Sequence, residues 1–104
     1  MYTPASSNEK IVSVGGVANV AIAVAAANTI VKAAPGRVCR LVITAAGTTA
    51  LTIFDNASTN SGTVLFATPA STVVGTIYDI QMPAQNGIVV QNTASGPAAT
   101  LSFA

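Results

Sequence analysis

The chain has 104 residues, of which 51% are hydrophobic and only 7% are charged, with a formal net charge of +1. This length suits one domain that buries its own core. Four scattered basic residues give no electrostatic footprint for nucleic acid, so we expect no nucleic-acid partner. The sequence has no His, which is the usual general base and a common zinc ligand, so we expect no enzymatic activity and no cofactor.

The low charge has a second consequence, which concerns association. Soluble proteins average about 25% charged residues, so the surface of this chain must consist largely of small and uncharged polar side chains. Colloidal repulsion is weak near zero net charge, and large uncharged apolar surfaces are rare on monomers. We therefore predict that a partner, most simply further copies of the chain, covers much of this surface. The alternative is a neutral monomer.

Residues 1–10, MYTPASSNEK, are polar, contain a proline and show no periodicity. They predict an N-terminal arm rather than part of the folded domain, which we assign to residues 11–104. In one interpretation the arm reaches over a neighbouring subunit and Tyr2 anchors it. In the other it is a frayed terminus.

Residues 11–31 form an apolar run whose length suits a signal peptide or a transmembrane helix. Two adjacent glycines and an asparagine interrupt the run, and Glu9 cancels the charge of Lys10. Apolar residues alternate with smaller or polar ones around residues 19–24, which favours strands and no membrane span. We predict strands at residues 11–14 and 17–25, with a helical turn at residues 25–27 as the alternative for the end of the second strand.

Residues 37–56, RVCRLVITAAGTTALTIFDN, predict two strands and the loop between them. Cys39, Leu41 and Ile43 occupy alternate positions of the first strand, and Leu51 and Ile53 continue an inward face in the second. The single cysteine lies in the apolar phase of its strand and has no partner for an internal disulfide. We therefore expect it to be a small buried core residue.

Turn residues bound the remaining predicted strands. Pro35-Gly36 marks one turn, Asn86-Gly87 is the strongest hairpin signal, and Pro83 is expected to end a strand because proline cannot donate to a ladder. The strands that these signals bound are residues 28–32, 63–67, 74–82, 88–91 and 98–103. Within residues 74–82, the even positions from Val74 to Met82 are predicted to share one face.

About eight strands with turn signals every eight to twelve residues are typical of an all-β sandwich or barrel. We predict a single-domain antiparallel β-sandwich that is jelly-roll-like, with an immunoglobulin-like sandwich as the alternative.

Few residues of the folded part offer chemistry. Asp55 and Asp79 are its only carboxylates, and we expect each to pair with Arg37 or Arg40, either across strands or between subunits. Asp55 also starts a turn, where Asp is common for capping reasons. A calcium site made of Asp55, Asn56 and loop carbonyls is an alternative, although one carboxylate is little for a hard cation. The tripeptide Asn56-Ala57-Ser58 matches a glycosylation acceptor, but such residues also shape loops for backbone reasons, which we prefer here.

Three segments together resemble small structural proteins of tailed bacteriophages: GRVCRLVITAAGTTALTIFDNAS, SGTVLFATP and VGTIYDIQMPAQNGIVVQ. The shared features are a Pro-Gly-Arg strand start, a strand and loop ending in Asp-Asn-Ala-Ser, and a Pro-x-x-x-Gly hairpin. The resemblance spans residues 31–103. It implies a virion component on the capsid exterior, made in the host cytoplasm, and of the decoration or cement type. Such proteins are typically β-sandwiches or jelly rolls that assemble as trimers or dimers.

On this basis we expect a structural virion protein that binds the outer capsid surface and stabilises the lattice. Its expected partners are the major capsid protein and further copies of itself, with a trimer favoured. Because charges are few, apolar and backbone contacts should dominate. The candidate contact residues are Tyr2, Pro4, Arg37 and Arg40. The alternative is a carbohydrate- or receptor-binding module of a fibre, with Tyr2 and Tyr78 as candidate aromatic contacts.

Overall fold

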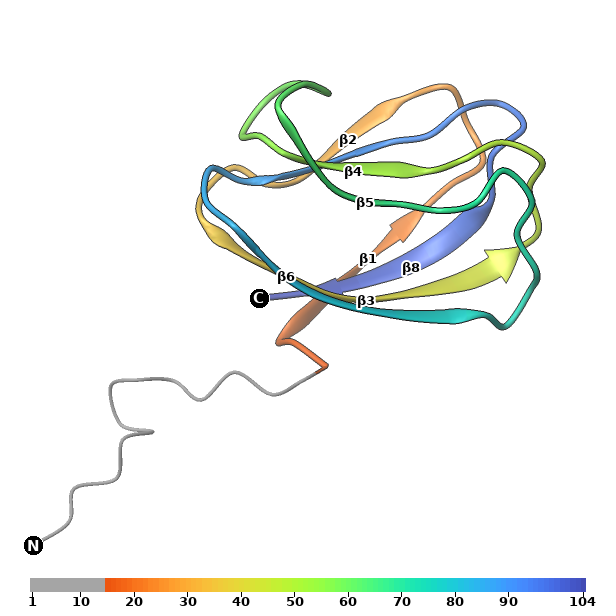
Figure 1. Ribbon diagram of the computed structural model, residues 1–104, viewed down its shortest axis with the longest axis horizontal. Coiled ribbons are helices and arrows are strands. Elements are labelled where there is room, and N and C mark those ends of the chain that lie inside the picture. The colour runs from red at the N-terminus through yellow and green to blue at the C-terminus, as the bar shows by residue number, and fades with distance from the viewer. Residues whose placement is uncertain (1–14) are drawn as a thin grey trace, which may run out of the picture.

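The computed structural model describes residues 15–104, which form eight antiparallel strands in two four-stranded sheets (Figure 1). The strands are β1 (Ala18–Ile22), β2 (Asn28–Lys32), β3 (Gly36–Ala45), β4 (Thr52–Asp55), β5 (Thr63–Ala67), β6 (Ile77–Ala84), β7 (Ile88–Gln91) and β8 (Ala98–Phe103). The predicted all-β sandwich is confirmed. No helix within residues 15–104 has the length and apolar character of a membrane span. The predicted arm, with Tyr2 and Pro4, and the predicted strand at residues 11–14 lie outside the described residues.

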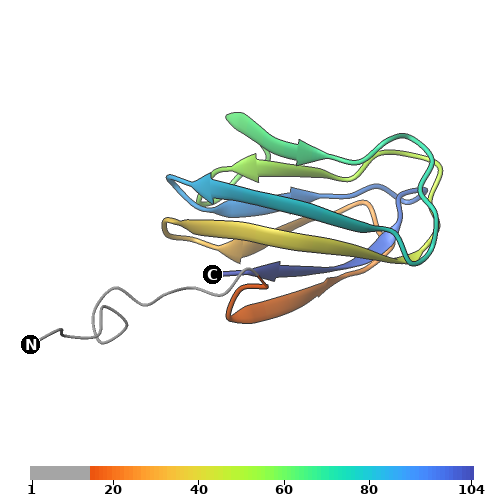
Figure 2. The ribbon, with the colours of Figure 1, turned by 60° about the horizontal axis from the view of Figure 1, so that its bottom comes forward.

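The strand pairing is nested. β1 pairs with β8, β2 with β7, β3 with β6 and β4 with β5, as in one long hairpin that is folded over on itself. Additional β3–β8 and β4–β7 pairings give the sheet orders β1-β8-β3-β6 and β2-β7-β4-β5. Figure 2 shows the first order, from orange β1 through dark blue β8 and yellow β3 to teal β6. This is a jelly-roll arrangement. An immunoglobulin-like sandwich places the first two strands side by side, whereas here β1 and β2 lie in different sheets.

The core fills the space between the two sheets. Alternate residues of the central strands point inward, and a fully buried Leu or Ile contributes about 1.5–3 kcal/mol to stability. Between the edge strands β5 and β6, the rings of Phe66 and Tyr78 pack with centroids 5.1 Å apart. The side chains of the core cluster are Ile22, Val38, Leu41, Ile43, Leu51, Ile53, Leu65, Ala84, Ile88, Val90, Ala99 and Leu101.

The predicted bounds of β6 were wrong at both ends. Pro83 does not end the strand, which continues to Ala84. β6 is an edge strand, where a residue without an N–H is tolerated because one side of the strand has no ladder partner. At the other end, Gly75 has a φ of 88° and the Thr76 N–H donates to the Val73 carbonyl at 3.2 Å. This turn delays the start of β6, so that Val74, predicted to share a face with Tyr78 in the strand, lies before the strand and is 59% exposed.

β3 contains a bulge at Cys39. Its register with β8 moves from Val38↔Phe103 to Arg40↔Ser102, so that two steps along β3 match one along β8. As a result Val38 joins the core cluster, while Cys39 is fully buried outside it, with its sulfur close to Gly16. The prediction that Cys39 is a small buried core residue is confirmed, although its side chain lies outside the main cluster between the two sheets.

β1 is shorter than predicted. It ends at Ile22, because the Ala23 carbonyl accepts a hydrogen bond from Asn92 Nδ2 at 2.8 Å instead of joining the ladder. Residues 23–27 form a bend, not the helical turn considered for this segment.

Candidate protein-contact surfaces

A polar network crosses the outer side of β3 and β6, and it starts from a second bulge. Between the pairs Val38↔Met82 and Arg40↔Asp79, three steps along β6 match two steps along β3. The extra residue introduces Gln81 at φ 52°, the one positive φ at a non-glycine residue within the described chain. Side chains rarely adopt this left-handed conformation, and such strain is often found at functional positions.

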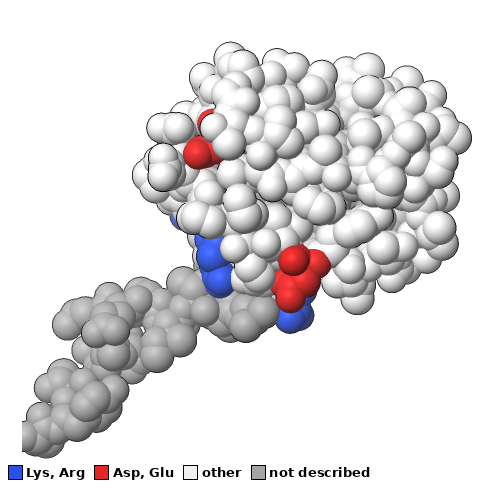
Figure 3. Space-filling model, viewed as in Figure 1, with Lys and Arg blue, Asp and Glu red and all other residues white. Residues whose placement is uncertain are grey.

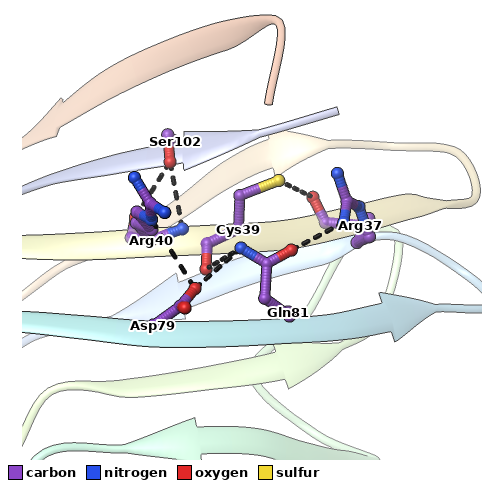
Figure 4. A network of polar contacts seen from close by, with 6 residues as sticks. All are labelled: Arg37, Cys39, Arg40, Asp79, Gln81 and Ser102. Carbon is purple, nitrogen blue, oxygen red and sulfur yellow. Dashed lines mark hydrogen bonds and ion pairs between the residues drawn. The ribbon is translucent and has the colours of Figure 1, made fainter. Parts of the chain in front are cut away.

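The bulge brings together both arginines of the predicted site (Figure 4). Arg37 Nη1 donates to Gln81 Oε1 at 2.6 Å, and Gln81 Nε2 donates to Asp79 Oδ1 at 2.8 Å. Arg40 Nε lies 3.6 Å from the same Asp79 oxygen, which confirms the predicted pairing of Asp79. Both side chains of this ion pair are exposed, so it contributes only about 0–1 kcal/mol.

Asp55 does not make the predicted pairing with an arginine of its own chain. Instead, its carboxylate accepts hydrogen bonds from the backbone N–H groups of Gln85 at 3.1 Å, Asn86 at 2.8 Å and Gly87 at 3.4 Å. The bond from Asn86 is the main reason why the pKa of Asp55 lies below its usual value, although partial burial opposes the shift. The last residue of β4 thus fixes the turn between β6 and β7.

Neither of the other two alternatives raised for this region gains support. The Asp55 oxygens already face three N–H donors, an arrangement that suits an anion and repels a cation. Residues 15–104 contain no group of three His, Cys, Asp or Glu side chains that could hold a metal. Asn56 Oδ1 accepts from the N–H groups of Ser58 and Thr59, both at 2.9 Å, so this side chain shapes its own loop as we expected.

Four loops meet at the opposite end of the sandwich from Asp55. They connect β1 to β2 (residues 23–27), β3 to β4 (46–51), β5 to β6 (68–76) and β7 to β8 (92–97), on the right of Figure 1. The loops are bonded to one another. The Thr48 N–H donates to the Ser95 carbonyl at 2.8 Å, and the Thr72 N–H donates to the Gly47 carbonyl at 3.2 Å. A Cβ on Gly47 would lie only 2.3 Å from the backbone nitrogen of Pro97, so the backbones of the β3–β4 and β7–β8 loops are in direct contact at this point.

No residue of these four loops is charged, and we call their joint surface the neutral end. It exposes three large apolar side chains: Val24 at 46%, Val73 at 70% and Val74 at 59%. Figure 3 shows that the coloured charged groups lie on the left and lower part of this view, while the right-hand part is uncharged. The sequence shows that each loop is uncharged, but only the fold places the four loops together.

The described residues offer little to a small ligand. No pocket opens in the part of the surface that residues 15–104 form. Tyr78, one of the two aromatic residues considered for sugar binding, is half-buried and packs against the core and Phe66.

No family model, no curated protein and no solved structure matches this chain. Its function must therefore be inferred from its sequence and from the surfaces just described.

Proposed function

We propose that the protein is a structural virion protein of the decoration or cement type, which binds the outer surface of a bacteriophage capsid and stabilises its lattice. The resemblance of residues 31–103 to phage structural proteins and the sandwich fold support this proposal. The observation that carries it is the neutral end, a surface made by four loops, without charge and with three exposed valines. We propose no enzymatic activity, since the whole sequence lacks His and both described carboxylates are held by partners.

The neutral end suits a protein lattice for a physical reason. Docking a charged surface removes ions from water, which is costly unless each ion finds a partner. An uncharged surface avoids this cost and gains from apolar burial and backbone hydrogen bonds. A protein that binds only the assembled lattice stabilises it by mass action, by about 2.7 kcal/mol per site at one hundred times its Kd.

The residues that the sequence predicted as contacts have a secondary role in this proposal. Arg37 and Arg40 lie in the β3–β6 network, and both already bind side chains of their own chain. We propose that this charged region, together with an arm containing Tyr2 and Pro4, contacts neighbouring subunits. The neutral end then provides the main contact with the major capsid protein. Self-association remains part of the proposal.

A substitution on the neutral end tests the function directly. Val73→Asp places a carboxylate at the most exposed of its three valines, and burying this charge without a partner should weaken binding to empty capsids by about tenfold or more. Met82→Asp is the matched control, because Met82 is 40% exposed and lies past the β6 bulge, away from the four loops. Capsid occupancy is measured by co-sedimentation over a range of protein concentrations. Equal occupancy by wild type and the Val73→Asp variant would reject the neutral end as the contact.

A further inference from the structure

An apolar row crosses the outer face of the β2-β7-β4-β5 sheet. Its members are register partners on neighbouring strands: Ile30 pairs with Val89, Val89 with Phe54, and Phe54 with Val64. Val89 lies between two core residues of β7 and therefore points away from the core. The row thus runs without interruption from one edge of the sheet to the other.

The exposure of the row is greatest at its two ends. Val89 is fully buried and Phe54 is half-buried, but Ile30 is 53% exposed and Val64 is 49% exposed. The outward face of an antiparallel sheet that meets water normally carries polar side chains. A continuous apolar row with open ends therefore indicates that this face has a partner.

A second row lies beside the first and contains no charge. Asn28 pairs with Gln91, Gln91 with Thr52, and Thr52 with Ala67. An Asn or Gln side chain carries both a donor and an acceptor, and so does the hydroxyl of Thr. Each of these groups is therefore able to bond to an identical group on another molecule, which a carboxylate or an ammonium group cannot do.

We propose that this face binds the same face of a second copy of the chain. In a two-fold contact each surface meets itself, so a charged group close to the axis faces its own repelling copy. The two rows carry no charge, and their polar members are balanced between donors and acceptors. The face is thus complementary to itself, and this complementarity points to a second copy rather than to an unrelated protein.

The proposed two-fold axis runs parallel to the strands. Only this orientation places the apolar row on the apolar row and the polar row on the polar row. It sets β2 above β5 of the other copy, and therefore Ile30 above Val64. The dimer then contains two Ile30–Val64 contacts, which cover the exposed ends of both rows. The sheets would stack about 10 Å apart with nearly aligned strands, the common packing of sheet on sheet.

This inference deepens the proposed function, of which self-association is a part, but it does not depend on capsid binding. It predicts a dimer, or a larger assembly that contains two-fold contacts, in place of the trimer expected from the resemblance.

A pair of charged variants tests both the face and the axis. We expect wild type to sediment as a dimer over a dilution series, and Ile30→Lys and Val64→Glu each to weaken dimerisation by about tenfold or more. An equimolar mixture of the two variants should restore the dimer. In the mixed pair, the introduced ammonium and carboxylate face each other at one contact, and the native Ile and Val meet at the other.

The controls separate this inference from the proposed function. Met82→Lys and Met82→Glu should remain dimeric, and Val73→Asp should remain dimeric while it loses capsid occupancy. A wild type that is monomeric or trimeric at all concentrations would overturn the proposal. So would charged variants that dimerise like wild type, or a mixture that stays monomeric although circular dichroism shows both variants folded.

Discussion

Asp55 shows how one carboxylate can organise a hairpin that is distant in the sequence. It accepts hydrogen bonds from the three backbone N–H groups of residues 85–87, which form a tight turn. Hydrogen bonds to the ionised form favour ionisation, so the pKa of Asp55 is lower in the folded chain than its ordinary value of 3.8. Asp55 therefore stabilises the fold through its charge.

This stabilisation predicts a specific dependence on pH. Since the folded pKa is depressed, the contribution is complete above the unfolded pKa and is lost as the pH falls through the folded value. Asp55→Asn resembles the protonated acid, so the variant should have a lower free energy of unfolding than wild type at neutral pH. The difference should shrink as the pH falls below 3.8.

Urea unfolding at several pH values measures this difference. Asp79→Asn is the control, because Asp79 belongs to an exposed ion pair and its loss should have little effect at any pH. A difference for Asp55→Asn that stays constant down to the lowest pH would show that the charge of Asp55 is not what holds the turn.

At the scale of strands, the sequence predicts those elements whose ends are set locally. β2, β5, β7 and β8 have the predicted bounds, because turn residues such as Pro35-Gly36 and Asn86-Gly87 stop the strands on their own. β1 and β6 differ for two reasons. A contact between distant segments, the bond from Asn92 to Ala23, sets the end of β1 and leaves no local pattern in the sequence. β6 starts late because of the turn at Gly75, and it continues past Pro83 because it is an edge strand.

Some features of the candidate surfaces could likewise be predicted from the sequence, and others could not. That Asp79 pairs with an arginine followed from the small number of charges, and it is confirmed. The bulges at Cys39 and Gln81 shift the alternation by one residue, and neither position carries the glycine that often marks such a site. The neutral end and the apolar row each combine residues from four separate segments, so they appear only once the strand order is known.

The β6 bulge makes a prediction about backbone strain. Gln81 holds a positive φ, and its side chain bonds to Arg37 and Asp79. Gln81→Ala should destabilise the fold, because it loses these bonds and keeps the strain. Gln81→Gly loses the same bonds but adopts positive φ freely, so it should be more stable than Gln81→Ala by about 1 kcal/mol.

Chemical denaturation of the two variants measures this difference. The same pair of substitutions at Asn19, in β1, is the control, since glycine is normally the less stable choice within a strand. An alanine variant at position 81 that is at least as stable as the glycine variant would show that the bulge is not strained.

At the scale of the whole molecule, ion pairs within residues 15–104 contribute little to stability. The part of the chain that the structure describes contains one ion pair, Arg40–Asp79, and both of its side chains are exposed. Stability therefore comes mainly from the apolar core and the strand ladders, which salt screens little. The neutral end and the apolar row, proposed as the main capsid contact and the dimer contact, are also uncharged.

This distribution of charge predicts how association should respond to salt. If the neutral end and the apolar row make the contacts, the Kd for capsids and the Kd of the dimer should change less than about threefold between 0.05 and 0.5 M NaCl, because no charged pair is there to be screened. Contacts made mainly by Arg37 and Arg40 would instead weaken steeply over this range. Titration of capsids at several salt concentrations distinguishes the two surfaces, and a steep loss of binding would assign the capsid contact to the arginines of β3 rather than to the four loops.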